Sequence, residues 1–281
     1  MASDQPGADA RQCSLVLFVA TSMEEEALEG AAKARGIPFE RIRAADLGEY
    51  HRLGVVGNES VIAARPAREA GRLVMGPLGR LGSAARAIRF REATGAQAIV
   101  QLGMAFGIDR STQKLGDVLV SSSLVPYDNR DVKSSRRGWL ARMLRQPEEY
   151  FVDYTQANRQ PARLALVELF LREQARGGHS FGIHVGAILS GSARIQSARF
   201  RDELVTGVPG GDDQIVGGEM EGVGLLAAST AADDPVWCIV KGISDFADVH
   251  RDCEIENARP IACRNAAEFV LTSLVNDASE E

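Results

Sequence analysis

The sequence predicts an α/β fold, because apolar runs of strand length alternate with stretches of helix length along most of the chain. No low-complexity linker interrupts this alternation. We therefore expect one domain over residues 13–281, preceded by a mobile tail over residues 1–12 that is polar and contains Gly and Pro. An irregular, Arg-rich segment near residues 128–162 is expected to be an excursion from this domain.

Each element is predicted from a local pattern. The apolar run from Cys13 to Ala20 indicates the first strand, and the helix that begins near Glu24 ends near Gly36. Gly57-Asn58 lies between two strand-like segments and favours a hairpin. Further strands are expected at residues 96–103, 116–125, 181–191 and 236–244. Further helices are expected after the Gly-rich loop 76–82 and at residues 162–176, 218–230 and 258–275.

Composition excludes several classes of protein. A formal net charge of −6 argues against general nucleic-acid binding, which usually needs a basic surface. No apolar run reaches the roughly 18 residues of a membrane span, and no secretory signal precedes Cys13. The four cysteines form no C-x-x-C pair and the four histidines share no metal spacing, so we expect neither a disulfide framework nor a metal site. A cytoplasmic protein with reduced thiols is expected.

The Gly-rich segment before the second helix resembles a phosphate-binding loop only superficially. Its pattern, Gly76-x-x-Gly79-x-x-Gly82, lacks the G-x-G-x-x-G spacing of a dinucleotide fold. It also lacks the G-K-[ST] ending of a P-loop. We interpret it as a tight loop that leads into a helix.

Carboxylates follow three of the expected strands. They are Glu24, Glu25 and Glu26 after the first strand, Glu219 and Glu221 in a Gly-rich run, and Asp245 and Asp248 after the strand at 236–244. Acidic residues are favoured at helix starts, which explains each group taken singly. Capping does not explain why three strand ends all carry carboxylates, and strand ends of an α/β sheet converge on one crevice. We therefore expect a ligand site there.

Four motifs carry a family resemblance. They are MEEE after the first strand, HVGAILSGSARI, GEMEGVGLLAA and VKGISDFAD. In this order they are similar to the nucleoside phosphorylase/nucleosidase superfamily, and most of all to its methylthioadenosine/S-adenosylhomocysteine nucleosidase branch. The C-terminal half also resembles divergent members found in bacterial defence systems. The resemblance covers most of residues 13–275 and implies a three-layer α/β/α fold with a mixed central sheet.

The resemblance assigns catalytic roles to two acids. Glu26, the third Glu of the first motif, would activate the attacking water. Asp245 would protonate purine N7 or share a proton with it, which helps most as the N-ribosidic bond breaks and the base becomes anionic. That role requires a protonated Asp245 at neutral pH, and so a pKa raised by burial or by a neighbouring carboxylate.

The resemblance also assigns substrate-binding roles. Glu221 would accept hydrogen bonds from the ribose hydroxyls, and Met220 would pack on the sugar. Ser244 would orient Asp245. The backbone of Arg194 and Ile195 would form hydrogen bonds with the edge of the adenine ring. Two departures from the family pattern concern the base pocket. Arg194 replaces an aromatic stacking residue, and a guanidinium also stacks on rings. The family's G-[ST]-A-G-G strand end reads G-M-A-F-G here, so Ala105 and Phe106 enter the pocket and Phe106 is a candidate for the missing ring.

These roles imply hydrolysis of the N-glycosidic bond of an adenine nucleoside or 5′-nucleotide, from AMP to ATP, with release of adenine and no cofactor. An anionic Glu near the water would repel phosphate and accept a proton instead, which favours hydrolysis over phosphorolysis. Three alternatives stay open: a methylthioadenosine/S-adenosylhomocysteine nucleosidase, a purine nucleoside phosphorylase, and a nucleotide-sensing module without turnover. The resemblance also implies a homodimer and, from the defence-associated members, defence-system partner proteins.

The group on the 5′ carbon is predicted from charge. Residues 249–252 are polar where thioether-accepting nucleosidases are apolar, and the excursion carries Arg136 and Arg137 among other basic residues. These residues form either a solvated basic loop or a phosphate clamp, because guanidinium groups match phosphate oxygens. On the second interpretation, a 5′-phosphorylated nucleotide is a better substrate than methylthioadenosine.

Overall fold

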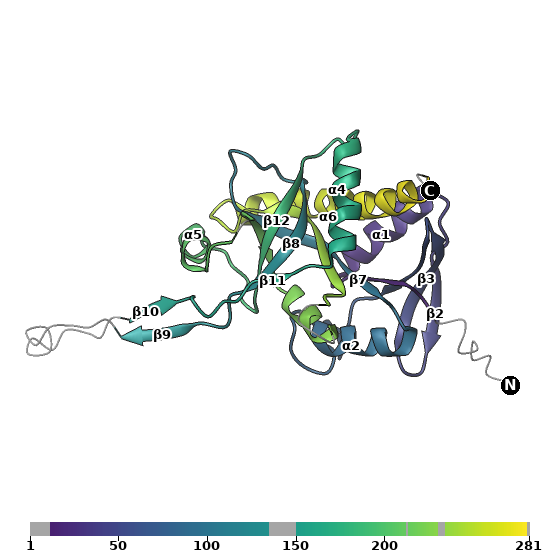
Figure 1. Ribbon diagram of the computed structural model, residues 1–281, viewed down its shortest axis with the longest axis horizontal. Coiled ribbons are helices and arrows are strands. Elements are labelled where there is room, and N and C mark those ends of the chain that lie inside the picture. Colours follow the sequence, from purple (N-terminus) through teal and green to yellow (C-terminus); the bar gives the residue numbers. More distant parts are fainter. Residues whose placement is uncertain (1–11, 135–149, 212, 230–233, 280–281) are drawn as a thin grey trace, which may run out of the picture.

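A computed structural model describes residues 12–134, 150–211, 213–229 and 234–279. A mixed sheet lies at its centre and helices cover both faces (Figure 1), so the predicted fold class is confirmed. The helices are α1 (Ser22–Ala34), α2 (Ser83–Thr94), α4 (Leu164–Arg176), α5 (Ala198–Gly207), the short 3-10 helix η2 (Gly222–Ala228) and α6 (Arg251–Asp277). Helices α1, α4 and α6 cover one face, while α2 packs with η2 on the other.

The main sheet contains both parallel and antiparallel pairs. Its strands are β1 (Leu15–Phe18), β2 (Glu40–Ala44), β3 (Gly48–Val56), β4 (Glu59–Ala64), β7 (Ala98–Gly107), β8 (Val118–Pro126), β11 (Gln160–Pro161), β12 (Ile183–Ser190), β13 (Ile215–Glu219) and β14 (Trp237–Asp245). Parallel β1 lies between β4 and β7. Strand β14 pairs with both β7 and β8, and the pairs β8–β12, β12–β13 and β13–β7 complete a closed ring of strands. The ring brings the ends of β7, β13 and β14 close together.

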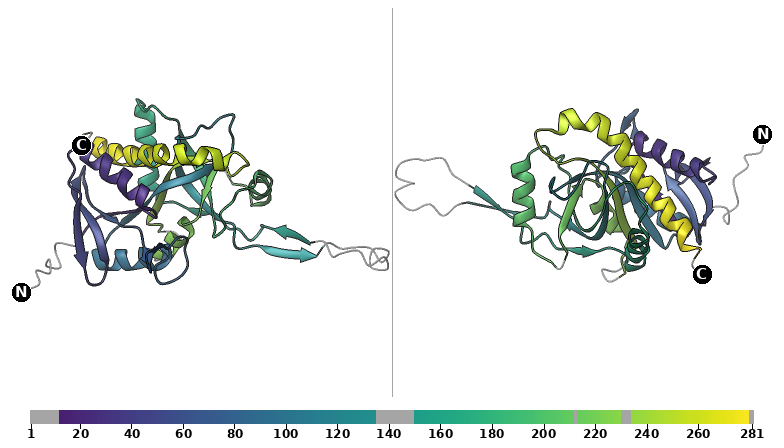
Figure 2. Two further views of the ribbon diagram at one scale, coloured as in Figure 1. Left: turned by 180° about the vertical axis from the view of Figure 1, so that it is seen from behind. Right: turned by 90° about the horizontal axis from the view of Figure 1, so that it is seen from above.

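Two small hairpins lie outside this sheet. One pairs β5 (Arg68–Glu69) with β6 (Arg72–Leu73), and the other pairs β9 (Asp131–Ser134) with β10 (Tyr150–Asp153). The β9–β10 hairpin belongs to the predicted excursion and projects from the sheet in the views of Figures 1 and 2. Arg136 and Arg137, the predicted phosphate clamp, lie outside the described residues.

The segment 218–230, predicted as one helix, is built differently. It begins inside β13, and of its described residues, 218–229, only Gly222–Ala228 are helical, as a 3-10 helix. The carboxylate of Glu219 accepts hydrogen bonds from the backbone N–H groups of Glu221 and Gly222, at 2.8 and 2.9 Å. A side chain that satisfies these free N–H groups ends the strand and starts the turn at once. The small residues of this segment permit the close packing of the turn. The helix-like spacing of its apolar residues does not reveal that the segment begins as a strand.

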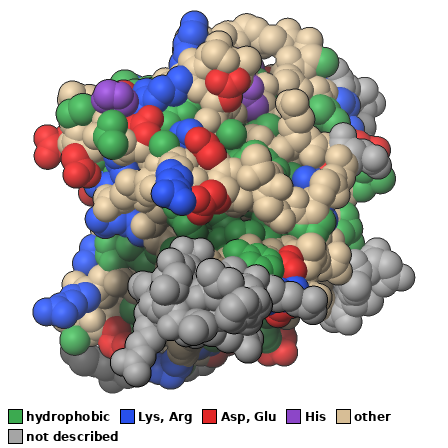
Figure 3. Space-filling model, turned by 90° about the vertical axis from the view of Figure 1, so that its left-hand side faces the viewer, with side chains coloured by type: hydrophobic (Ala, Val, Ile, Leu, Met, Phe, Trp, Pro, Cys, Tyr) green, Lys and Arg blue, Asp and Glu red, His purple; other side chains and the backbone are tan. Residues whose placement is uncertain are grey.

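Figure 3 shows the distribution of charged side chains on one face of the molecule. Acidic and basic side chains are interspersed there rather than gathered into a patch of one sign. Among the described residues, no helix is both long enough and apolar enough to cross a membrane.

Candidate active site

A cavity of about 400 Å³ opens where the ends of β1, β7, β13 and β14 meet. All of the predicted site residues that fall in the described chain line it, with one exception. Those that line it are Ala105, Phe106, Arg194, Ile195, Met220, Glu221, Ser244 and Asp245. The exception is Glu26. The convergence of carboxylates from separate strand ends is therefore present in the structure.

Glu24, rather than Glu26, is the acid that the first motif contributes to this cavity. Glu24 lines the cavity and is buried, whereas Glu26 is exposed and does not line it. The physical reason is helix geometry: two residues span about 200° of an α-helix, so the two side chains leave α1 on opposite sides. Glu25, between them, pairs with His51 and Arg65 of the neighbouring hairpin.

Backbone N–H groups hold the Glu24 carboxylate in place. Ala20 and Thr21 donate to Oε2 at 2.7 and 2.8 Å, and Met104 donates to Oε1 at 3.1 Å. Thr21 Oγ1 in turn accepts from the Glu24 N–H, so Thr21 and Glu24 form a capping box at the start of α1. Burial raises the pKa of Glu24 above its usual range, and nearby Lys241 acts in the opposite direction.

Glycine at position 103 allows this approach. Gly103 has φ +148°, and a Cβ atom there would lie 2.0 Å from Glu24 Oε1. The carboxylate therefore occupies space that any other residue at this point of β7 would fill. The position of the Glu24 carboxylate therefore requires glycine at the start of the G-M-A-F-G segment.

A buried lysine links the other acids. Lys241 is fully buried in β14, donates to Glu221 Oε2 at 2.8 Å, and lies 3.3 Å from Glu219 Oε2. Burial alone would lower the pKa of Lys241, but the carboxylates of Glu221, Glu219 and Glu24 raise it above its usual range. Lys241 is therefore a permanent cation that compensates the cluster of acids beside it and fixes the direction of Glu221.

Asp245 lies at the end of β14, and both of its carboxylate oxygens accept hydrogen bonds. Ser244 Oγ donates to Oδ2 at 3.0 Å, and the Ala247 N–H donates to Oδ1 at 2.9 Å. Arg251, in the first turn of α6, places Nε 3.5 Å from Oδ1. Asp245 is buried but lines the cavity, so it is both fixed and accessible to a ligand.

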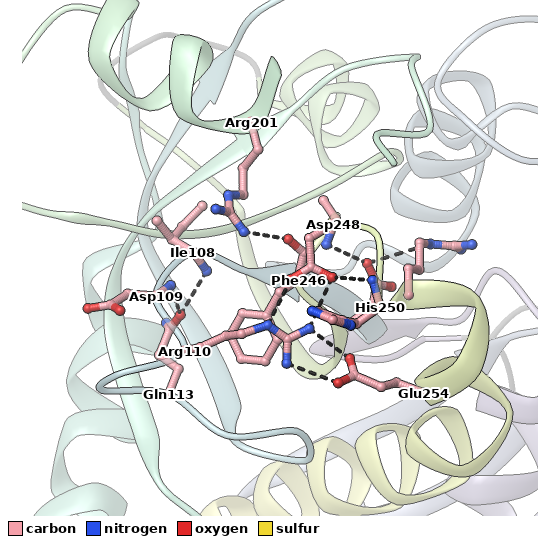
Figure 4. Close-up of polar contacts among 12 residues, drawn as sticks. Ile108, Asp109, Arg110, Gln113, Arg201, Phe246, Asp248, His250 and Glu254 are labelled. Carbon is pink, nitrogen blue, oxygen red and sulfur yellow. Dashed lines mark hydrogen bonds and ion pairs between the residues drawn. The ribbon is translucent and has the colours of Figure 1, made fainter. Parts of the chain in front are cut away.

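Arg110 secures the loop that carries Asp245 to α6 (Figure 4). Its guanidinium donates to both carboxylate oxygens of Asp248, at 2.7 and 3.1 Å, and to both of Glu254, at 3.0 and 2.8 Å. The same group lies over the Phe246 ring, 4.3 Å from its centroid. Asp248 is therefore a structural acid in the described chain, not a member of the cavity.

The base-pocket residues differ in exposure. Ile195 and Phe106 are buried and belong to one apolar cluster, and Phe106 packs against the backbone of Gly218 in β13. Arg194 is exposed at the mouth of the cavity. Phe106 is thus the ring beside the cavity, and Arg194 is free to approach a ligand from solvent.

Sequence reasoning missed four residues of this site. Glu24 had a local signal, since Thr21-x-x-Glu24 has the spacing of a capping box and so predicts a carboxylate that turns back to the strand end. The sequence also contains a signal for Lys241, because a single cation inside the apolar run VWCIVKGIS requires buried acidic partners. Arg251 belongs to the polar stretch 249–252 noted above but was given no role there, and Arg259 follows from no pattern that we recognise in the sequence.

Comparisons with known proteins place this cavity in context. No family model matches the sequence. The chain is 31% identical over 192 residues to a death domain-containing ATP nucleosidase of Amphimedon queenslandica; the match covers 64% of this chain and 34% of that protein. It is 25% identical over 204 residues to a 5′-methylthioadenosine/S-adenosylhomocysteine nucleosidase of Haemophilus ducreyi, covering 73% and 79% of the two chains. The chain therefore spans only about a third of the length of the first of these relatives.

The fold is shared with solved nucleosidase structures. The 5′-methylthioadenosine/S-adenosylhomocysteine nucleosidase of Neisseria meningitidis, in complex with methylthio-immucillin-A, superposes with a TM-score of 0.66 at 17% identity. That superposition covers 93% of this chain and 98% of the other. These relatives and this likeness confirm the resemblance to the nucleoside phosphorylase/nucleosidase superfamily that the motifs indicated.

Proposed function

Because the chain is related in sequence to nucleosidases and has their fold, we propose that it is a hydrolase that cleaves the N-glycosidic bond of an adenine nucleoside or 5′-nucleotide. One observation carries the proposal: Glu24, Glu221 and Asp245 come from three separate strand ends and line one cavity. A cavity of about 400 Å³ is within the range of small-molecule sites.

In the proposed reaction, Glu24 accepts a proton from water as the water oxygen bonds to C1′ of the ribose. A carboxylate whose pKa is raised by burial is a stronger base than one in water, which suits this role. Its two oxygens accept three backbone hydrogen bonds and retain lone pairs for the water. In this proposal Glu24 has the water-activating role that the family resemblance assigned to Glu26.

The leaving group and the sugar have their own partners in this proposal. As the bond from C1′ to the purine breaks, Asp245 in its protonated form donates to N7, so adenine leaves as a neutral base. Glu221 accepts hydrogen bonds from the ribose hydroxyls, with Lys241 holding its carboxylate, and Met220 packs on the sugar. Phe106, Ala105, Arg194 and Ile195 line the part of the cavity proposed for the base.

Two candidates remain for the group on the 5′ carbon. The name of the Amphimedon relative, an ATP nucleosidase, supports a 5′-nucleotide. The Haemophilus relative is named for methylthioadenosine and S-adenosylhomocysteine, and apolar Met23, Leu73, Met75 and Ile255 in the cavity lining suit a thioether. We propose the nucleotide as substrate and retain the thioether nucleoside as the second candidate.

Adenine release tests the proposal. We expect free adenine from ATP, AMP, adenosine or methylthioadenosine in phosphate-free buffer, with the free sugar or its 5′-substituted form as the other product. Added phosphate should not raise the rate. A ribose 1-phosphate product would assign a phosphorylase instead, and saturable binding without any product would assign a sensing module.

We further propose that the chain acts in the cytoplasm as a homodimer, and with partner proteins where it belongs to a defence system. This rests on the superfamily resemblance alone. Sedimentation velocity tests the dimer, for which a monomer at micromolar concentration is the contrary result.

A further inference from the structure

Arg259 lines the cavity and has no hydrogen-bond or ion-pair partner in the described part of the chain. It lies in α6, and its Nε atom is buried and makes no hydrogen bond within that part. The neighbouring cations are engaged: Lys241 binds Glu221 and Glu219, and Arg251 lies against Asp245. A guanidinium presents five donors, and burying one of them unpaired is unfavourable unless a ligand completes the set.

Helix geometry sets Arg259 apart from the base end of the cavity. Arg251, Ile255 and Arg259 are spaced four residues apart, so they share one face of α6, and all three line the cavity. Arg251 contacts Asp245, the proposed partner of the purine. A rise of 1.5 Å per residue places the Arg259 backbone about 12 Å further along the helix.

Four apolar residues of the cavity lining have no role in holding base or ribose in the proposed reaction. They are Met23, Leu73, Met75 and, one turn before Arg259 on α6, Ile255. A neutral thioether would fill the apolar part of this region and leave the guanidinium without a partner.

We propose that Arg259 binds the phosphate attached to the 5′ carbon, and so selects 5′-phosphorylated adenine nucleosides over nucleosides with a neutral 5′ group. The inference rests on the proposed function, because it takes the orientation of the substrate from Asp245 and Glu221. It moves phosphate recognition from Arg136 and Arg137 of the excursion to a residue inside the cavity. Guanidinium groups bind phosphate through charge-assisted hydrogen bonds, often two at once.

The test measures a ratio: kcat/KM for AMP divided by kcat/KM for adenosine, in the wild type and in Arg259→Ala, Arg259→Lys and Arg264→Ala. Arg264 is an exposed residue of the same helix that does not line the cavity, so its variant removes one charge without touching the site. We expect Arg259→Ala to lower the ratio by about 10- to 100-fold, the effect of losing hydrogen bonds between charged groups. Lysine should retain part of the preference as a point charge, and Arg264→Ala should keep the wild-type ratio.

Binding of AMP and adenosine by calorimetry, with Glu24→Gln added to each protein to suppress turnover, gives the same comparison, so the two proposals can fail separately. If the wild type releases no adenine but Arg259→Ala still loses AMP affinity relative to adenosine, the hydrolase is contradicted and the phosphate contact stands. If Arg259→Ala melts like the wild type and keeps its preference for AMP, the phosphate contact is overturned. A ratio that falls equally in Arg259→Ala and Arg264→Ala would show only long-range charge, and would also overturn it.

Discussion

Glu24 must be ionised to accept a proton, yet its surroundings disfavour ionisation. Burial raises its pKa, and the charge of Lys241 only partly offsets that effect. The ionised form is present above this raised pKa and is lost as pH falls through it. Activity of the free enzyme should therefore decline on the acid side at a higher pH than an ordinary glutamate, with its pKa of about 4.3, would cause.

A profile of kcat/KM against pH checks this expectation, because it reports groups of the free enzyme. Circular dichroism over the same range separates titration from acid unfolding. An acid limb at or below pH 4.3 in a still-folded protein would contradict a base with raised pKa.

Asp245→Asn should remove most of the activity, because an amide cannot deliver a proton to purine N7. The expected loss in kcat is about 10²- to 10⁴-fold. Ser244→Ala removes only the hydroxyl that donates to Asp245 Oδ2, and should reduce the rate less. Single-turnover rates of adenine release measure both. Normal turnover by Asp245→Asn would show that the base is protonated elsewhere.

At the scale of elements, β7 and α1 meet at a single contact that needs glycine. Gly103→Ala would put a methyl group 2.0 Å from Glu24 Oε1, in a backbone conformation that suits glycine, so the carboxylate must move. We expect a loss of activity comparable with that of a Glu24 variant, together with a lower melting temperature. Gly210→Ala is the control, since a Cβ there meets nothing within 4 Å and no unusual φ is required. Wild-type rates in Gly103→Ala would contradict the contact.

Helix α1 also contains a glycine with no such reason to be there. Gly30 lies inside the helix, is exposed, and a Cβ at this position meets nothing within 4 Å. Alanine restricts the unfolded chain and favours the helix, so Gly30→Ala should stabilise the protein by about 0.5–1 kcal/mol. Urea denaturation measures the change, while adenine release should stay at the wild-type rate. A destabilised variant would mean that α1 is not helical around residue 30.

At the scale of the whole molecule, sequence pattern was sufficient to locate several strands along the chain and to predict the convergence of acids. Apolar runs and turn residues predicted β1, the β3–β4 hairpin, β8 and β14, because these signals are local. The strand β13 was hidden in a Gly-rich run, since its end is defined by hydrogen bonds to Glu219 and not by any period of its own.

The site was predictable only where motif and geometry agree. Ser244 and Asp245 are the last residues of β14 and Glu221 follows the end of β13, so the motifs assigned these three residues correctly to the cavity. In the first motif three adjacent glutamates look equivalent, and the choice among them depends on where α1 begins. The partnerships of Lys241, Arg251 and Arg259 depend on packing between β14, β13 and α6, which one sequence does not encode locally.

The central claim is that Glu24 activates water in an adenine-releasing hydrolase, and one comparison tests it most directly. The rate of adenine release is measured for the wild type, Glu24→Gln and Glu26→Gln under identical phosphate-free conditions. Each substitution removes one carboxylate from the same helix, but only Glu24 lines the cavity. The account predicts a fall of about 10²- to 10⁴-fold for Glu24→Gln and a rate near wild type for Glu26→Gln. The reverse result, an inactive Glu26→Gln beside an active Glu24→Gln, would contradict it.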